Sequence, residues 1–201
     1  MFEQVLQPGN LKAAWKKVKA NQGAPGIDGI SVEEFASFMR QHWETIRRKQ
    51  EEGSYRPSPV RRCLISKPDG SKRKLGIPTV LDRVIQQAIT QVLRPVLEPA
   101  FSDHSCGYRP GRSAREAVEE LQKEGNKRGS KCHVVDCDLK SFLDTVDHGK
   151  LMGRLRDEVD DFRLLRLIAR YLKAGVILPD GTLEETTEGV PQGGPLSRSR
   201  S

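Results

Sequence analysis

Apolar residues return every three or four positions along much of the chain, which is the spacing of one face of an α-helix. In three of these stretches a Ser or Thr is followed three positions later by an acidic residue, which is typical of a helix start. The pattern predicts helices at 10–20, 31–52, 80–97, 113–125, 148–157 and 161–173. In the third helix Val80, Val84, Ala88 and Ile89 share a face, so we expect it to be partly buried.

The predicted ends of the helices follow from particular residue types. Asn10 is expected to be the N-cap of the first helix, and Gly53 is expected to stop the second. Pro95 and Pro99 should mark the end of the third, because proline removes a backbone donor and crowds the preceding turn. The glycine-rich stretch 21–30 should be a loop.

Short apolar runs bounded by turn residues predict strands. The runs 60–65 and 73–77 flank the turn Lys67-Pro68-Asp69-Gly70-Ser71 and should form a hairpin. A second hairpin is expected from 175–178 and 183–187 around Pro179-Asp180-Gly181-Thr182. The segment 133–139 reads as an apolar strand that ends on acidic residues. The expected fold class is α+β.

Composition excludes a membrane protein and a disulfide scaffold. With 36% hydrophobic and 30% charged residues, the 201-residue chain has the composition of one soluble domain or two small ones. No apolar run approaches the roughly 18 residues of a membrane span, and the first ten residues do not resemble a secretory signal, so a cytoplasmic location is expected. Cys132, His133 and Cys137 could be metal ligands, but reduced thiols on a buried strand explain them better.

The net charge of +7 and the pI near 9.4 favour a polyanionic partner. Seven basic residues against one acid lie between Arg56 and Lys74, including Arg61 and Arg62. This hairpin could be a solvated surface or a strip that contacts phosphates.

Four aspartates gather near the end of the predicted strand 133–139: Asp136, Asp138, Asp144 and Asp147. Asp136 and Asp138 are two positions apart, so they share a face of an extended chain. Carboxylates at a strand end suit Mg²⁺, which prefers oxygen ligands and keeps waters for phosphate substrates. The alternative is that these acids form ordinary turns. Close by in the sequence, the glycine-rich segment 189–197 would let a nucleotide approach its backbone, or would simply be a loop, with Gln192 at its centre.

The order of these segments resembles the group II intron reverse transcriptases, also called intron maturases. Residues 21–31 look like the family's N-terminal extension motif, and 55–89 and 101–118 look like its two fingers blocks. Residues 134–148 resemble the first palm motif, and 186–197 resemble the palm block beside the nucleotide. The resemblance implies a right-hand polymerase with fingers at 1–130 and an incomplete palm at 131–201.

The resemblance also implies roles for individual residues. Asp138 would be the catalytic aspartate, and its carboxylate and the carbonyl of Leu139 would bind Mg²⁺. Lys67 and Arg73 would grip the incoming triphosphate, whose charge must be neutralised, and Gln192 would lie against the sugar. The residues expected to contact nucleic acid are Arg61, Arg62, Gly107, Arg109 and Arg112. The implied partners are intron RNA, an RNA template with its DNA primer, and dNTPs, with no membrane; a monomer and a dimer both remain open.

Two departures from the family pattern matter. The family usually has an aromatic residue where Leu143 stands, and that ring excludes ribonucleotides, so sugar selectivity is in doubt. The sequence also has no Tyr-x-Asp-Asp, the motif whose aspartates complete the metal site, and it ends Arg198-Ser199-Arg200-Ser201. We therefore expect a truncated, marginally soluble chain without polymerase activity of its own.

Other functions remain open at this point. The chain could be a non-catalytic fragment that binds intron RNA. It could also come from a retron or CRISPR-associated reverse transcriptase, since these share the palm blocks, although residues 21–31 and 55–118 favour the intron type. A plain α+β domain with a basic surface is the least specific alternative.

Overall fold

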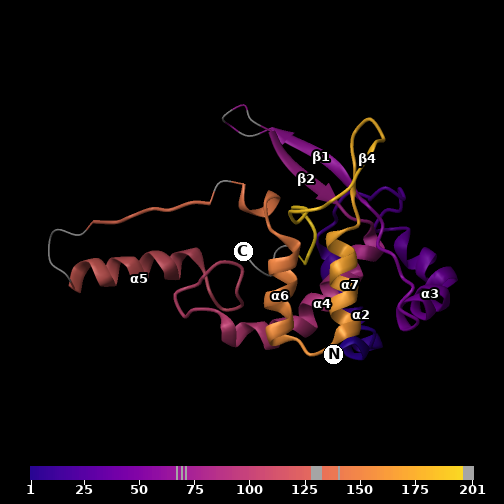
Figure 1. Ribbon diagram of the computed structural model, residues 1–201, viewed down its shortest axis with the longest axis horizontal. Helices are drawn as coiled ribbons and strands as arrows, with labels where there is room; N and C mark the ends of the chain where they lie inside the picture. Colours follow the sequence, from indigo (N-terminus) through magenta and orange to yellow (C-terminus); the bar gives the residue numbers. More distant parts are fainter. Residues whose placement is uncertain (67, 69, 71, 128–132, 140, 197–201) are drawn as a thin grey trace.

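The computed structural model describes residues 1–66, 68, 70, 72–127, 133–139 and 141–196. Its helices and strands are α1 Phe2–Val5, α2 Pro8–Ala20, α3 Phe35–Glu51, β1 Val60–Ser66, β2 Lys72–Ile77, α4 Val80–Leu97, η1 Glu98–Ala100, α5 Ala114–Lys127, η2 Phe142–Asp144, α6 His148–Glu158, α7 Phe162–Leu172, β3 Val176–Ile177 and β4 Leu183–Glu184. Figure 1 shows a compact body and a long arm that extends from it. The arm consists of the described residues between 101 and 139, with α5 on one side and the segment 133–139 on the other.

Helix α4 is the centre of the body. Thr79 caps it by accepting a hydrogen bond from the Asp82 N–H, and the predicted face of Val80, Val84, Ala88 and Ile89 is buried. The surrounding core includes side chains from α1, α2, α6 and α7, so a single cluster of buried apolar residues joins residues 1–130 to residues 131–201. Within the part of the chain that is described, no helix is both long enough and apolar enough to span a membrane.

A four-stranded sheet lies against one end of this helical core, in the order β2-β1-β3-β4. The first predicted hairpin is confirmed: β1 and β2 are antiparallel from Arg61 opposite Ile77 to Ser66 opposite Lys72. The second predicted hairpin also forms, although β3 and β4 have only two residues each. Because β3 pairs in parallel with β1, the sheet joins the first hairpin to the second.

A buried carboxylate ties three segments of the body together. Asp82 accepts hydrogen bonds from the hydroxyls of Tyr55 at 2.7 Å, Tyr171 at 3.0 Å and Thr79 at 2.8 Å, and from the N–H of Ser58 at 3.1 Å. Burial raises the pKa of Asp82 despite these four donors, and it also raises the pKa of both tyrosines well above the ordinary value. The network therefore fixes the start of α4 to α7 and to the chain that leads into β1.

Three arginines of α7 attach this helix to the end of α3. Arg163 donates to the carbonyl of Glu51 at 2.9 Å, Arg166 to that of Gly53 at 2.7 Å, and Arg170 to that of Tyr55 at 3.0 Å. Carbonyls at a helix C-terminus lack helical donors, and cations suit this end of the helix dipole. The three guanidinium groups therefore donate to backbone carbonyls of the protein itself.

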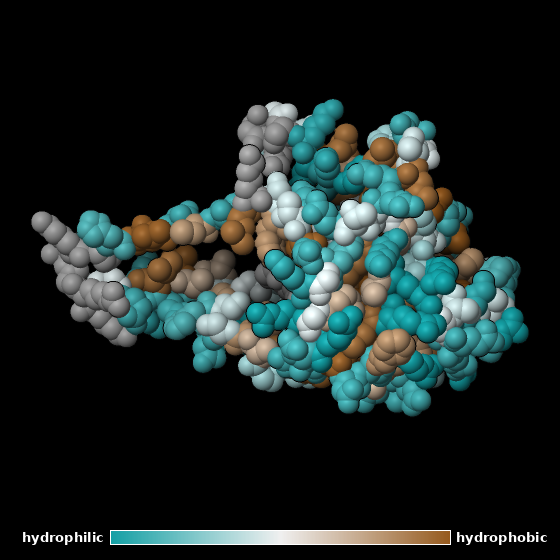
Figure 2. Space-filling model, in the orientation of Figure 1, coloured by the Kyte–Doolittle hydropathy of each residue, from teal (hydrophilic) through white to brown (hydrophobic). Residues whose placement is uncertain are grey.

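The segment 133–139 is not the predicted strand. It is extended, but none of its residues forms a β-strand pair with another described residue, and all seven side chains are exposed. Val134 and Val135 are 74% and 83% exposed, and Figure 2 shows apolar side chains along both sides of the arm. A strand requires a neighbour for its backbone N–H and C=O groups, and the alternation of residues alone cannot supply one.

The predicted start of the first helix is also wrong. Helix α2 begins at Pro8 rather than at Asn10, because Pro fits the first turn and the Asn10 amide instead donates to the carbonyls of Val5 and Ala88. The predicted end of the third helix is confirmed: α4 ends at Leu97, between Pro95 and Pro99, before the chain tightens into η1.

Candidate functional site

The glycine-rich segment lies beside the segment that follows the predicted palm strand. The Gly189 N–H donates to the carbonyl of Val146 at 2.8 Å, and the Val190 N–H donates to that of Leu143 at 2.7 Å. Nε2 of the buried His148 lies 2.7 Å from the Gly189 carbonyl, so this nitrogen carries the hydrogen. The two predicted palm blocks, 134–148 and 186–197, therefore meet through backbone hydrogen bonds.

This close approach explains why glycine stands at position 189. Gly189 has φ +79°, and a Cβ built on it would lie 2.7 Å from the Asp144 carbonyl oxygen. Any other residue would combine a disfavoured backbone conformation with a steric clash. Glycine is therefore required for the contact between the two segments.

The same segment then crosses β2 and brings two predicted nucleotide-binding residues together. The Gly76 N–H donates to the backbone carbonyl of Gln192 at 2.7 Å. Nε of Arg73 donates to Oε1 of Gln192 at 3.0 Å, although the two residues are 119 positions apart in the sequence. A guanidinium on a hairpin thus lies against an amide on the glycine-rich segment, with other donors of the guanidinium still able to bind an anion.

The other predicted nucleotide-binding residues are placed differently. Leu143 is half-buried and borders an apolar cavity of about 430 Å³ between the palm segments and α4, α6 and α7. Lys67 lies outside the described residues, so its prediction stays open.

Arg61 and Arg62, predicted to contact nucleic acid, make contacts within the protein. Arg61 donates to the carbonyl of Pro25 at 2.7 Å, which holds the loop 21–31 against β1. Arg62 forms an ion pair with Glu184 of β4 at 3.6 Å. Both side chains thus support the sheet and its neighbouring loop.

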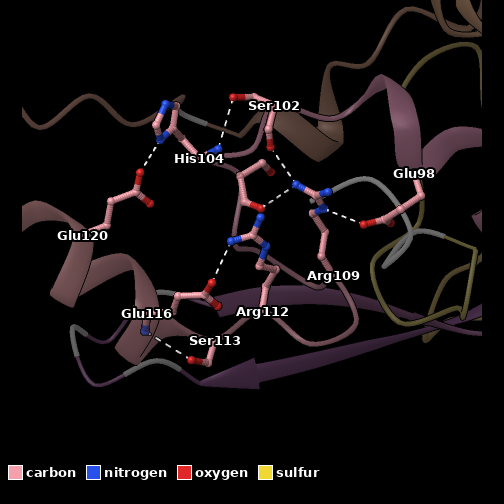
Figure 3. Close-up of polar contacts among 9 residues, drawn as sticks. Glu98, Ser102, His104, Arg109, Arg112, Ser113, Glu116 and Glu120 are labelled. Carbon is pink, nitrogen blue, oxygen red and sulfur yellow. Dashed lines mark hydrogen bonds and ion pairs between the residues drawn. The ribbon is translucent and has the colours of Figure 1, made fainter.

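Arg109 and Arg112 organise the base of the arm (Figure 3). Arg109 forms an ion pair with Glu98 at 2.8 Å and donates to the carbonyls of Ser102 and Ser105. Arg112 forms an ion pair at 2.6 Å with Glu116, in the first turn of α5. Gly107, the third predicted residue of this block, is exposed. The two arginines therefore fold the loop 101–112, and their contact with a template stays a prediction.

Asp138 and Leu139, the predicted metal ligands, lie on the exposed segment 133–139. The Leu139 carbonyl accepts a hydrogen bond from the Phe142 N–H, and Asp147 caps α6 by accepting from the Lys150 N–H at 2.7 Å. Among the described residues no three His, Cys, Asp or Glu side chains are grouped as a metal site would require. Cys132, of the alternative Cys-His-Cys ligand set, is outside the described residues.

Sequence reasoning missed a polar stripe on α4. Arg83, Gln87, Thr90 and Arg94 recur at helical spacing on a helix whose other faces are largely apolar. Arg83 is only 8% exposed, which is unusual for an arginine. The sequence does indicate this stripe, because polar residues at i, i+4, i+7 and i+11 define one face of a helix just as apolar residues do.

Comparison with known protein families agrees with this arrangement. The family model described as "Reverse transcriptase (RNA-dependent DNA polymerase)" matches residues 65–200. The chain belongs to this family, whose members use divalent metal ions.

Its relatives include proteins encoded by introns. The chain is 34% identical over 198 residues to the group II intron-encoded protein LtrA of Lactococcus lactis subsp. cremoris, covering 98% of this chain and 32% of LtrA. It is 35% identical over 203 residues to protein YkfC of Escherichia coli (strain K12), covering 98% of this chain and 52% of YkfC. The predicted resemblance to group II intron reverse transcriptases is therefore confirmed, and the chain spans about half or less of these relatives.

A solved structure supports the predicted fold. A chain of the "Partial Cas6-RT-Cas1--Cas2 complex" superposes with a TM-score of 0.64 and 23% sequence identity, covering 98% of this chain and 32% of that one. At this identity the likeness concerns the fold alone. The α+β fold of the chain is that of the right-hand polymerases, as the sequence predicts.

Proposed function

We propose that residues 1–201 supply the fingers and part of the palm of a group II intron-encoded RNA-directed DNA polymerase that also assists splicing and mobility of its intron RNA. The observation that carries the proposal is the contact between Arg73 and Gln192, beside the junction of the two palm segments. The family match and the intron-encoded relatives support it. The proposed partners are an RNA template, a DNA primer, dNTPs and intron RNA.

In this proposal Arg73, together with Lys67, neutralises the triphosphate of the incoming nucleotide. Gln192 lies against the sugar, and Leu143 borders the sugar edge of the same site. A cation is needed because negative charge on the phosphates must be stabilised while the primer 3′ hydroxyl attacks. The Arg73 side chain is exposed, so it can reach a ligand without unfolding its strand.

For the metal we propose Mg²⁺, with the Asp138 carboxylate and the Leu139 carbonyl among its ligands. Mg²⁺ prefers oxygen ligands and keeps waters beside phosphate substrates. One exposed carboxylate binds such an ion poorly, and the 201 residues contain no Tyr-x-Asp-Asp. We therefore propose that the chain alone does not extend a primer. Any extension of a labelled primer on an RNA template by the purified chain would refute this.

Nucleotide binding provides the direct test. We expect a fluorescent dATP analogue to bind the purified chain in the presence of Mg²⁺. Arg73→Ala should weaken this binding about tenfold, since a charge-assisted contact to phosphate contributes on the order of 1.4 kcal/mol. Arg47→Ala, which removes an exposed arginine on α3, is the matched control and should leave the affinity unchanged. Equal affinity of the Arg73 variant and the wild type would contradict the assignment.

A second candidate is intron RNA binding without catalysis, which the scattered carboxylates and the net charge of +7 favour. Restoring a complete palm distinguishes the two. In a full-length polymerase that carries these residues, Asp138→Ala should abolish DNA synthesis and leave RNA binding intact. If synthesis persists, the catalytic assignment of Asp138 is wrong.

A further inference from the structure

A small pocket of about 230 Å³ lies where the end of α3 meets α7. Residues of α1, of the segment 50–55 and of one face of α7 line it. Figure 1 shows both helices in the body, with α3 on the side away from the arm. None of the described residues that line the pocket belongs to the proposed nucleotide site. A ligand here would therefore bind independently of Arg73.

Gln50 is a buried polar side chain in the wall of this pocket. Only 2% of its surface is exposed, and its Nε2 is buried without a hydrogen-bond partner among the described residues. A buried amide donor without an acceptor costs more free energy than an ordinary hydrogen bond contributes. An apolar side chain would fill the same place without this cost. The amide thus indicates an acceptor that enters the pocket from outside.

Three guanidinium groups line the same pocket. Arg163, Arg166 and Arg170 are three and four positions apart on α7, so they follow one another along one face of the helix. Each donates to one backbone carbonyl of the segment 51–55. Their side chains make no further hydrogen bond or ion pair with a described residue. Because a guanidinium has five N–H donors, most of the donors of each arginine can still bind a ligand.

The charge around the pocket is positive. Two acidic residues line it, but Glu51 forms an ion pair with Arg47 at 2.9 Å, and Glu52 is exposed to solvent. Burial lowers the pKa of Arg170, and the positive charge of neighbouring arginines lowers it further. A bound anion would offset this repulsion between like charges.

The size of the pocket selects a compact anion. Sites for drug-sized ligands usually measure roughly 300 to 1,000 Å³, and a water molecule takes up about 30 Å³ of the liquid. A volume of about 230 Å³ therefore holds a phosphate group with some water, but not a whole nucleotide. Guanidinium groups also match the paired oxygens of a phosphate in geometry and charge.

We propose that this pocket binds a compact phosphate dianion, either inorganic phosphate or a small phosphate monoester. Its donors are the guanidinium groups of Arg166 and Arg170 and the Nε2 of Gln50. Because these donors come from α3 and α7, the site exists only in the folded chain, and the anion stabilises the junction of the two helices. The proposal does not require the proposed polymerase function.

The test is isothermal titration calorimetry with sodium phosphate. The 201-residue chain carrying Arg73→Ala serves as the parent, so that phosphate held at the proposed nucleotide site does not contribute. Gln50→Leu and Arg166→Gln should each weaken phosphate binding about tenfold, since each removes a donor to a charged ligand. Arg48→Gln removes an exposed arginine of α3 that does not line the pocket, and it should leave the affinity unchanged.

Stability measurements separate binding from folding. Arg166→Gln also loses the hydrogen bond to the Gly53 carbonyl, so it could weaken the fold as well. Gln50→Leu removes an amide nitrogen that has no partner among the described residues, so its melting temperature without phosphate should equal or exceed that of the parent. Added phosphate should raise the melting temperature of the parent but not that of Gln50→Leu.

Glu52→Gln tests the charge of the pocket in the opposite direction. The change removes an exposed carboxylate from the lining and leaves every proposed donor in place, so phosphate should bind about threefold more tightly. Weaker binding by this variant would contradict the proposed site.

Two outcomes would overturn the proposal. In the first, the parent binds no phosphate, or Gln50→Leu and Arg166→Gln bind it as tightly as the parent does. In the second, acetate binds as tightly as phosphate, so that the pocket does not select a dianion. Glycerol phosphate distinguishes the two sources, because tighter binding than inorganic phosphate identifies a monoester and weaker binding identifies the free ion. The dATP titration of the Arg73 site is decided separately, so either proposal can fail without the other.

Discussion

The body and the arm differ in how many of their side chains are buried. The body has a continuous apolar core and a buried Asp82 with four hydrogen-bond donors. Between Glu98 and Asp147, by contrast, no described residue is buried, and the arm exposes Val118, Leu121, Val134 and Val135 (Figure 2). The body can therefore be stable through its own contacts, whereas the arm presents apolar surface that has nothing to pack against among the described residues.

The largest expected difference is in amide hydrogen exchange. Backbone amides of Ile85 and Ile89, within α4, should exchange only on global unfolding, and those of Val134 and Val135 should exchange at nearly the rate of an unstructured peptide. The amides of Val134 and Val135 should exchange about a thousandfold or more faster than those of Ile85 and Ile89, given the stability of an ordinary domain. Exchange measured residue by residue with NMR checks this. Comparable protection of both segments would show that the arm is held by contacts that the structure does not contain.

Removal of the buried carboxylate should have the largest effect on stability. Asp82→Ala leaves two tyrosine hydroxyls, one threonine hydroxyl and one backbone N–H without their acceptor, so the free energy of unfolding should fall by about 3 kcal/mol. Urea denaturation followed by circular dichroism measures it. Asp157→Ala, an exposed aspartate on α6, should change stability by less than about 0.5 kcal/mol. Similar losses in both variants would mean that the network contributes little.

An intermediate effect is expected where the palm segments meet. Gly189→Ala should cost about 1 to 2 kcal/mol, because alanine disfavours a positive φ and its Cβ would clash with the Asp144 carbonyl oxygen. Gly153→Ala is the contrasting change, since a Cβ within α6 meets nothing within 4 Å. It should stabilise the chain by about 0.5 to 1 kcal/mol. Thermal denaturation of both variants tests the pair, and a neutral Gly189→Ala would argue against the tight contact.

The smallest effect is expected in the arm. Asp138→Asn should change the free energy of unfolding by no more than about 0.5 kcal/mol, because the carboxylate is exposed and makes no contact that the body depends on. The same urea experiment measures it beside Asp82→Ala. A loss above 1 kcal/mol would show that the segment 133–139 packs against the rest of the protein in solution.

The sequence predicted best where short-range rules decide the structure. The Thr79 cap, the buried face of α4 and the antiparallel pairing of β1 with β2 involve residues close together in the sequence. The segment 133–139 was predicted wrongly because a strand depends on a partner strand, which local patterns do not reveal. Features that depend on neighbouring residues could therefore be predicted from the sequence, whereas the pairing of distant segments could not.

The candidate site was only partly predictable for a similar reason. The resemblance to a family placed Arg73 and Gln192 in one site, and the structure brings these two together. No local pattern indicates that Arg61 bonds to the Pro25 carbonyl or that Arg109 bonds to those of Ser102 and Ser105. From the sequence alone, every arginine can be assigned to an external anion. The structure shows which arginines already donate to acceptors within the protein.

The hydrogen bond from Tyr171 to Asp82 also bears on how the chain folds during synthesis. The two residues are 89 positions apart, and ribosomes add roughly 5 to 20 residues per second. Asp82 is therefore made roughly 4 to 18 s before Tyr171 and before the α7 arginines that bond to residues 51–55. During that interval the start of α4 lacks part of its polar support. The nascent first half of the chain should thus stay loosely packed, and exposed to chaperones, until the second half emerges.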